Sequence, residues 1–312
     1  MGKTAIIFPG QGAQFVGMAK DFSGAFDVAR RTFEEANELL GFDLSAICFN
    51  GPAERLDATD VSQPAIFATS VAVWRSMQEA GIADELRPQA TAGLSLGEYT
   101  ALWLAGSLSF ADGLRLVYQR GQFMQEAARQ SPGGMVSIMG LSAEQTEALC
   151  REAADGHVLA AANFNCPGQI VISGSKEACE RSAVLVEKHG GRGTALRVAG
   201  AFHSELMAPA AEQLKEVLSR TPISAPRLPV VSNVSADYHR GPDSIRELLY
   251  TQVARPIRWQ QSIERLIADG FDRFAEVGPG RVLSGLMRKI NRAATSLNYS
   301  TAESFAGARA AR

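Results

Sequence analysis

Cysteine is scarce in this chain and net charge is nearly absent, and both scarcities narrow the classes of protein to which it can belong. The 312 residues carry 31 basic and 33 acidic side chains, for a formal net charge of -2. Because general nucleic-acid binding draws on a basic surface, we expect no nucleic acid among its partners. The four cysteines form no C-x-x-C pair and have no paired histidines beside them; they are Cys48, Cys150, Cys166 and Cys179. They therefore indicate reduced thiols and no metal site.

Long apolar runs are absent as well. No segment approaches the roughly 20 apolar residues that cross a bilayer, and the apolar run in MGKTAIIFPG is too short for a signal peptide and enters a strand directly. The chain has no internal repeat or low-complexity segment. We expect a cytoplasmic monomer without a membrane contact, built as one large domain or as two unequal ones.

One pentapeptide, Gly93 to Gly97, carries the strongest catalytic signal. It reads G-L-S-L-G between an extended apolar approach and a helix-forming segment. This is the nucleophile-elbow pattern, in which a sharp turn between strand and helix exposes the oxygen of a serine, here Ser95. Backbone N–H groups at such a helix start can stabilise an oxyanion. The alternative is an ordinary turn flanked by glycines.

A second loop follows the first expected strand, Thr4 to Phe8. It runs from Gly10 to Gln14 and carries two amide side chains, including that of Gln11. Open α/β sheets bind ligands at this end of their strands, although the loop lacks the lysine and third glycine of nucleotide-binding fingerprints. A plain turn is the alternative.

The helix expected from Phe110 to about Arg129 places an arginine among apolar side chains. At about 100° per residue, Arg120 shares a face with Leu116, Val117, Phe123 and Met124. A buried arginine needs an anionic partner because an unpaired charge costs several kcal/mol. A structural ion pair or an extended stem with an exposed head is the alternative.

Another helix is expected over residues 62–80, with Pro64 in its first turn. Gln63 stands at the start of this helix. It can face either solvent or a site, and the pattern favours solvent.

The middle of the chain has a different texture. Residues 134–198 alternate as strand, helix, strand, strand, helix and strand, which is the ferredoxin-like motif. We predict a small ferredoxin-like domain at 132–198, inserted into a large α/β-hydrolase-like domain at 1–131 and 199–291. Residues 292–312 lack periodicity and are expected to be a mobile tail.

His203 stands where the chain re-enters the large domain, at an expected helix start. There the helix dipole favours the neutral imidazole that a general base needs; a capping or surface histidine is the alternative. The contexts of His157, His189 and His239 suggest solvent.

Together these segments resemble the malonyl-CoA:acyl carrier protein transacylase family. The glutamine loop, the serine pentapeptide, Arg120 and His203 occur in the family's order and spacing, as do the runs NCPGQIVISG, NVSA and EVGPGRVLSGL. The resemblance covers about residues 3–291. It implies transfer of a malonyl group from malonyl-CoA to the phosphopantetheine thiol of acyl carrier protein, with ping-pong kinetics and no cofactor or metal, for fatty acid or polyketide synthesis.

The resemblance also implies a role for each matching residue. Ser95 resembles the family's nucleophile and His203 its general base and acid. The backbone N–H groups of Leu96 and Gln11 resemble its oxyanion hole. Arg120 resembles the arginine that binds the malonyl carboxylate as a bidentate fork.

Further positions match the family's substrate-binding motifs. The backbone carbonyl of Gln252 resembles the group that orients the histidine in place of a triad carboxylate. Asn163 and Gln169 belong to the small-domain motif that lines the cleft, and Gln63 is a further substrate-binding candidate. Phe202 resembles the bulky residue of malonyl-selective relatives, which leaves little room for a methyl branch.

Two positions depart from the family pattern. Leu94 stands where most members have histidine, and Ala13 where serine is commoner. Neither position carries an assigned chemical role, although the absent histidine can alter the fine tuning of the site. Arg281, Arg288 and Lys289 are candidates for docking an acidic carrier protein, and solvated surface charge is the alternative.

Two rival functions remain at this stage. The first is a serine hydrolase or thioesterase with the same elbow, which usually has an acidic residue between serine and histidine in the chain; Asp155 is a candidate. The second is a non-catalytic acyltransferase-like scaffold. Retention of Ser95, His203, Arg120 and Gln11 together argues against the scaffold.

Overall fold

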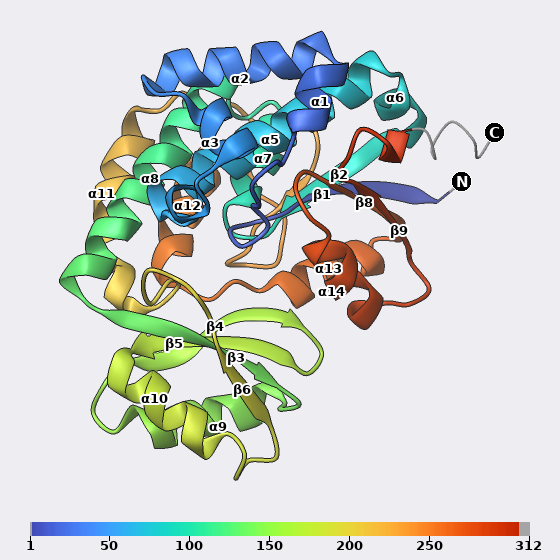
Figure 1. Ribbon diagram of the computed structural model, residues 1–312. Helices are drawn as coiled ribbons and strands as arrows, with labels where there is room; N and C mark the ends of the chain where they lie inside the picture. The colour runs from blue at the N-terminus through green and yellow to red at the C-terminus, as the bar shows by residue number, and fades with distance from the viewer. Residues whose placement is uncertain (1, 306–312) are drawn as a thin grey trace.

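Two β-sheets organise the molecule, which we describe from a computed structural model over residues 2–305 (Figure 1). The first is a five-stranded parallel sheet in the order β7-β2-β1-β8-β9. Its strands are β1 (Lys3–Phe8), β2 (Pro88–Gly93), β7 (Val230–Val231), β8 (Phe271–Val277) and β9 (Thr295–Tyr299).

Helices surround this parallel sheet in the upper part of Figure 1. The N-terminal helices are α1 (Lys20–Ala25), α2 (Asp27–Leu40), α3 (Leu44–Asn50), α4 (Ala53–Asp57), α5 (Thr59–Glu79), α6 (Ile82–Leu86), α7 (Gly97–Leu104) and α8 (Phe110–Gln130). Those that follow the second sheet are η1 (Glu205–Met207), α11 (Ala208–Arg220), α12 (Pro242–Ala254), α13 (Trp259–Ala268) and α14 (Val282–Ile290).

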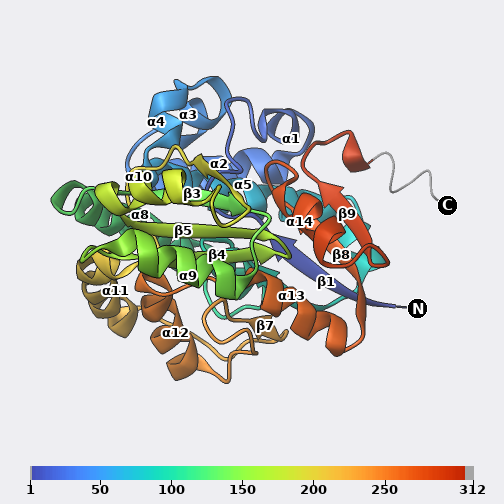
Figure 2. The same cartoon turned by 90° about the horizontal axis from the view of Figure 1, so that it is seen from below.

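The second sheet is antiparallel and lies below the first in Figure 1, with two helices on its outer face (Figure 2). Its elements in chain order are β3 (Gly133–Met139), α9 (Ala143–Ala154), β4 (Leu159–Cys166), β5 (Gln169–Ser175), α10 (Lys176–Leu185) and β6 (Arg192–Ala195). This order and the strand order β4-β5-β3-β6 confirm the predicted ferredoxin-like motif. All six elements fall within residues 132–198, although the limits of the domain themselves stay a prediction.

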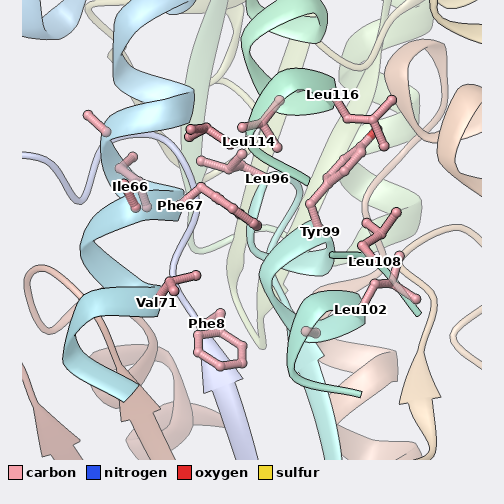
Figure 3. Close-up of a cluster of buried hydrophobic side chains, with 14 of the residues drawn as sticks. Phe8, Ile66, Phe67, Val71, Leu96, Tyr99, Leu102, Leu108, Leu114 and Leu116 are labelled. Atoms are coloured by element: carbon pink, nitrogen blue, oxygen red, sulfur yellow. The ribbon is translucent and has the colours of Figure 1, made fainter. Parts of the chain in front are cut away.

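An apolar core beside the parallel sheet holds the helices that carry the site in position (Figure 3). Apolar side chains of α5, α7 and α8 meet beside β1, and the rings of Phe67 and Phe110 stack with centroids 5.8 Å apart. Every side chain of α5 from Val61 to Trp74 is buried, as expected of a helix that lies inside a large domain. This packing sets the position of Arg120, which α8 carries.

The start of α5 corrects one prediction. The helix begins at Thr59, three residues earlier than expected, so that Pro64 lies inside the helix and not in its first turn. No side chain of the preceding segment caps this helix, but Gln125 of α8 accepts a hydrogen bond from the Thr59 N–H at 3.3 Å. A partner from a distant helix is invisible to a local sequence pattern.

The expectation of a mobile tail is also wrong for the residues that the structure describes. β9 pairs in parallel with β8, and the buried ring of Phe305 packs against Phe22 and Phe26 at centroid distances of 5.2 and 5.4 Å. These contacts are with residues of other elements, and Phe22 and Phe26 lie at the opposite end of the sequence, so the periodicity of the segment itself gave no signal. Residues 306–312 lie outside the described part of the chain.

The parallel strands end side by side, and this alignment builds the site. Phe8 of β1 is in register with Gly93 of β2, and the Leu94 N–H donates to the carbonyl of Phe8 at 3.1 Å. The Gln11 loop therefore lies beside the Ser95 turn, and β7 ends next to them, just before Asn233. The carboxyl edge of a parallel sheet is where such folds bind their ligands.

Candidate active site

Ser95 occupies the turn between β2 and α7. Its φ of 51° lies in the left-handed region, where a residue other than glycine costs about 1–3 kcal/mol. Gly93 and Gly97 permit the turn, because a Cβ on either glycine would overlap neighbouring backbone atoms. The predicted strand-to-helix turn is confirmed.

His203 lies against the serine. Its Nε2 is 2.9 Å from the Ser95 Oγ, and its Nδ1 is 2.8 Å from the backbone carbonyl of Gln252. Because a carbonyl only accepts hydrogen bonds, Nδ1 carries the hydrogen and Nε2 is left to accept the serine proton. This is the protonation pattern of a general base.

The neutral imidazole has a cause other than the predicted helix dipole. Burial, and then the positive charge of Arg120, lower the pKa of His203 to about 3, against a partial rise from its bond to Gln252. The η1 turn begins two residues later and is only three residues long. Desolvation and a nearby cation therefore keep this base unprotonated.

Arg120 is the buried cation of the site. Its side chain is 1% exposed, and its guanidinium donates to Gln63 at 2.7 Å, to the Ser95 Oγ at 3.0 Å and to the Gln252 side-chain oxygen at 3.0 Å. Burial lowers the pKa of Arg120, which the nearby Tyr99 and Glu98 partly offset. Among residues 2–305, no carboxylate forms a salt bridge with this guanidinium.

Gln63 corrects the expectation of a solvent-facing side chain. It is fully buried and accepts a hydrogen bond from Arg120. The side chain faces α8, where its partners are Arg120 and the sulfur of Met124. Gln252, in contrast, lies where the resemblance predicts, with its backbone carbonyl on His203.

Two backbone N–H groups next to Ser95 remain without partners. Within the described chain, neither the Leu96 N–H nor the Gln11 N–H makes a hydrogen bond. Leu96 directly follows the serine at the start of α7, and Gln11 stands in the loop after β1. Free donors of this kind are what an oxyanion needs.

A cavity of about 380 Å³ opens onto Ser95, Arg120 and His203. Its wall from the antiparallel sheet includes Asn163, Gln169 and also Asn165, which the sequence analysis did not single out. The side-chain oxygens of both asparagines are buried without a partner, so each can accept a hydrogen bond from a ligand. Further lining comes from Gln11, Leu94, Met124, Met135, Val171, Phe202, Val282 and Leu286.

Three buried residues behind the serine were missed by the sequence analysis. Asn233 accepts a hydrogen bond from the Ser95 N–H at 2.5 Å and donates to the carbonyl of Gly93 at 2.8 Å. Glu98 and His239 form a fully buried pair, 2.7 Å apart. The expectation that His239 faces solvent is therefore wrong. Glu98 alone had a local signal, a carboxylate in the apolar first turn after the elbow.

No carboxylate completes a triad in the part of the chain that the structure describes. The partner of the His203 Nδ1 is a backbone carbonyl, and Asp155 ends α9 as an exposed residue. The acid that a serine hydrolase of this type usually has is therefore not in contact with the histidine. Among the same residues, no cluster of three or more His, Cys, Asp or Glu side chains could hold a metal ion.

A strained serine, a neutral histidine bonded to it and free N–H donors beside it define enzymes that transfer acyl groups through a serine ester. Comparison with known proteins agrees with this class. The acyl transferase domain family matches residues 5–305. The chain belongs to this family and, within it, to the malonyl CoA-acyl carrier protein transacylases, and it is an acyltransferase.

Two relatives illustrate the likeness. The malonyl CoA-acyl carrier protein transacylase of Bacillus subtilis (strain 168) is 45% identical over 98% of this chain and 96% of its own length. The crystal structure of an acyl carrier protein S-malonyltransferase from Vibrio cholerae aligns with a TM-score of 0.93 and 41% identity, covering 98% of this chain and 99% of that one.

A third relative is described as a malonyl-transacylase in complex with the acyl carrier protein of a type II polyketide synthase. It aligns with a TM-score of 0.94 and 40% identity, covering 99% of this chain and 100% of the relative's chain. Within the described residues, no helix is long and apolar enough to cross a membrane.

Proposed function

We propose that this enzyme transfers a malonyl group from malonyl-CoA to the phosphopantetheine thiol of acyl carrier protein. The observation that carries the proposal is Arg120, a buried cation whose hydrogen-bond partners among the described residues are all neutral and whose guanidinium lies 3.0 Å from the Ser95 Oγ. An acyl group attached to that oxygen would have its free carboxylate within reach of the guanidinium. A substrate that brings its own anion explains why the protein leaves this charge without a carboxylate.

The first half of the reaction makes an acyl-enzyme. His203 Nε2 takes the Ser95 proton, and the oxygen attacks the thioester carbon of malonyl-CoA. The resulting oxyanion is held by the N–H groups of Leu96 and Gln11; removing one such donor typically costs about 10²–10³ in rate. When the carbonyl re-forms, the carbon–sulfur bond breaks, and the imidazolium returns the proton to the sulfur of coenzyme A.

The second half reverses these steps with a different thiol. His203 takes the proton of the phosphopantetheine thiol, whose sulfur attacks the malonyl-serine ester. The Ser95 oxygen leaves and regains the proton from His203. No cofactor is needed besides the two substrates, and the kinetics are ping-pong. The ring of Phe202 beside His203 narrows the cavity against a methyl branch on the acyl group.

Exposed cations near the cleft are candidates to receive the carrier protein. Arg281, Arg288 and Lys289 are exposed on or next to α14, and Lys289 donates to Gln169 of the cavity wall at 3.1 Å. Reversing the charge of Arg281 or Arg288 should raise the KM for carrier protein and leave the KM for malonyl-CoA unchanged. Equal changes in both constants would remove this surface from the proposal.

The test supplies the enzyme with malonyl-, methylmalonyl- or acetyl-CoA, with and without phosphopantetheinylated carrier protein, and weighs all products. We expect a malonyl-enzyme on Ser95, malonyl transfer to the carrier protein, and parallel double-reciprocal lines. Free malonate formed as fast as coenzyme A, with or without carrier protein, would instead establish a thioesterase. The same assay distinguishes a scaffold, which would form no acyl-enzyme.

A further inference from the structure

A buried carboxylate stands behind the catalytic groups without touching the histidine. Glu98 is fully buried in the first turn of α7, three residues after Ser95. One of its oxygens is 2.7 Å from the Nε2 of His239; the other accepts from the Asn233 N–H at 3.0 Å and from the Gln252 side-chain amide at 2.7 Å. The Asn233 N–H and the Gln252 amide nitrogen can only donate, so the carboxylate oxygen that faces them is an acceptor.

Gln252 connects this carboxylate to every group that reacts. Its side-chain nitrogen donates to Glu98 and, at 3.1 Å, to the Ser95 carbonyl. Its side-chain oxygen accepts from Arg120, and its backbone carbonyl accepts from His203. One residue thus touches the nucleophile's backbone, the base and the substrate-binding cation.

Glu98 determines which way the Gln252 amide points. With the amide nitrogen on the carboxylate, the amide oxygen faces Arg120. A rotated amide would place its oxygen against the carboxylate and its nitrogen against the guanidinium, and both contacts would be repulsive. The orientation of Arg120 beside Ser95 therefore depends on Glu98.

His239 completes the arrangement from the loop after β7. Since a carboxylate only accepts, the His239 Nε2 carries the hydrogen, and its Nδ1 has no partner within the described residues. Asn233, on the same loop, donates its backbone N–H to Glu98. Its side chain accepts from the Ser95 N–H and donates to the Gly93 carbonyl, so it bonds both ends of the strained turn. The pair thereby ties the elbow, α12 and the β7 loop together at one point.

We propose that Glu98 and His239 are positioning residues for acyl transfer: through Gln252 they fix His203 and Arg120 relative to Ser95. The inference rests on the proposed malonyl transfer for its selectivity readout only. In the described part of the chain no carboxylate contacts His203. The buried acid, Glu98, contacts Gln252 instead, and Gln252 contacts both His203 and Arg120.

The test compares two variants of Glu98 with a matched buried carboxylate elsewhere. Glu276 is also fully buried, but it accepts from Leu283 and Ser284 of α14 and from Asn298 of β9. None of these three residues is hydrogen-bonded to Ser95, His203 or Arg120. Glu98→Leu removes the acceptor for Gln252, whereas Glu98→Gln keeps an oxygen for it. Glu276→Gln controls for loss of a buried charge.

We expect Glu98→Leu to lower the acylation rate of Ser95 about 100-fold, the scale of an ångström-sized misplacement, and to reduce the preference for malonyl-CoA over acetyl-CoA. Glu98→Gln should recover most of that loss but stay about 3- to 10-fold below wild type, while Glu276→Gln stays within about twofold. A second pair repeats the logic, since His239→Gln keeps a donor for Glu98 and His239→Phe does not.

An unchanged preference in folded Glu98→Leu, or equal effects of Glu98→Gln and Glu276→Gln, would overturn the inference. If Glu98→Leu does not fold, the two glutamine variants and the His239 pair decide. Labelling of Ser95 by a fluorophosphonate, whose fluoride leaves as the serine oxygen bonds to phosphorus, reports nucleophile positioning without malonyl-CoA. The inference is thus tested even if wild-type enzyme fails to transfer malonyl groups, an outcome that would contradict only the proposed function.

Discussion

The part of the molecule built on the parallel sheet and the part built on the antiparallel sheet differ in the polar side chains that they bury. Around the parallel sheet, five glutamate, arginine and histidine side chains of the described residues are buried, namely Glu98, Arg120, His203, His239 and Glu276. Between residues 133 and 195, the buried polar side chains are all neutral: Thr146, Asn165, Ser173 and Ser182. A buried charge costs several kcal/mol unless it is partnered, and each of these five side chains has hydrogen-bond partners; four of them belong to the network around Ser95, whereas Glu276 is bonded to α14 and β9.

The difference assigns separate tasks to the two parts. The part built on the parallel sheet supplies Ser95 from the end of β2, Arg120 from α8 and the proposed base, His203, from the segment before η1. The antiparallel sheet encloses an ordinary apolar core, which includes Val136, Ile138, Leu149 and Ile172, and presents Asn163 and Asn165 to the cavity. We expect that substitutions of the catalytic groups in the first part change the chemistry, and that substitutions in either apolar core change mainly stability.

The largest expected effect is that of Ser95→Ala, which removes the proposed nucleophile. Transfer to carrier protein should fall about 10³-fold or more, and mass spectrometry should detect no malonyl-enzyme. The matched control is Ser173→Ala, because Ser173 is also buried, in the antiparallel sheet, and its hydroxyl has no partner among the described residues. A comparable rate loss in the control would show that the antiparallel part also contributes to the chemistry.

Next in size is Arg120→Ala. Loss of a charge-assisted hydrogen bond, worth about 1.5–3 kcal/mol, should reduce malonyl transfer roughly 10- to 100-fold and acetyl transfer much less, as measured by kcat/KM for each substrate. Arg181→Ala is the control, since that guanidinium donates to the carbonyls of Ala153 and Ala154 within the antiparallel part. Equal losses for malonyl and acetyl groups would mean that Arg120 has a structural role.

A smaller effect should come from trimming one methyl group from each core. Ile172 in β5 and Ile7 in β1 are both fully buried, and Ile→Val at either position should lower the free energy of unfolding by about 0.5–1.5 kcal/mol. Chemical denaturation gives the stability, and the malonyl-to-acetyl ratio should stay at the wild-type value. A shifted ratio for Ile172→Val would show that the antiparallel core also tunes the site.

The smallest expected change is in the acid limb of the pH profile. Because the pKa of native His203 is lowered to about 3, the acylation rate should show no inflection near the usual histidine value of about 6.5. Stability behaves differently: between these two values the unfolded chain binds the proton and the native histidine does not, so the free energy of unfolding falls as pH falls from about 6.5 toward 3. Single-turnover acylation and denaturation at each pH separate the two.

An inflection in the acylation rate near pH 6.5 would show that His203 titrates as an exposed histidine does. His203→Ala provides the reference for the stability measurement, because the variant lacks the titrating group and should lose the corresponding part of the pH dependence.

Local patterns in the sequence determined the framework of this enzyme. The glycines around Ser95 predict a turn that only small neighbours permit, and strand and helix periodicity predicts the ferredoxin-like order of residues 134–198. Both depend on residues close together in the chain, where steric limits and side-chain spacing act directly. The family resemblance then predicted the positions of His203, Arg120 and the Gln252 carbonyl.

Only the tertiary structure decided how the buried charges are partnered. Glu98 and His239 are 141 residues apart in the chain, and Glu98 and Gln252 are 154 apart; their contacts arise because parallel strands end at one edge. Gln63 faces inward because its partners, Arg120 and Met124, lie on another helix, and pairing with β8 makes a strand of residues 295–299, which have no sustained periodicity. Charges are buried where distant partners meet, and a linear pattern cannot show that meeting.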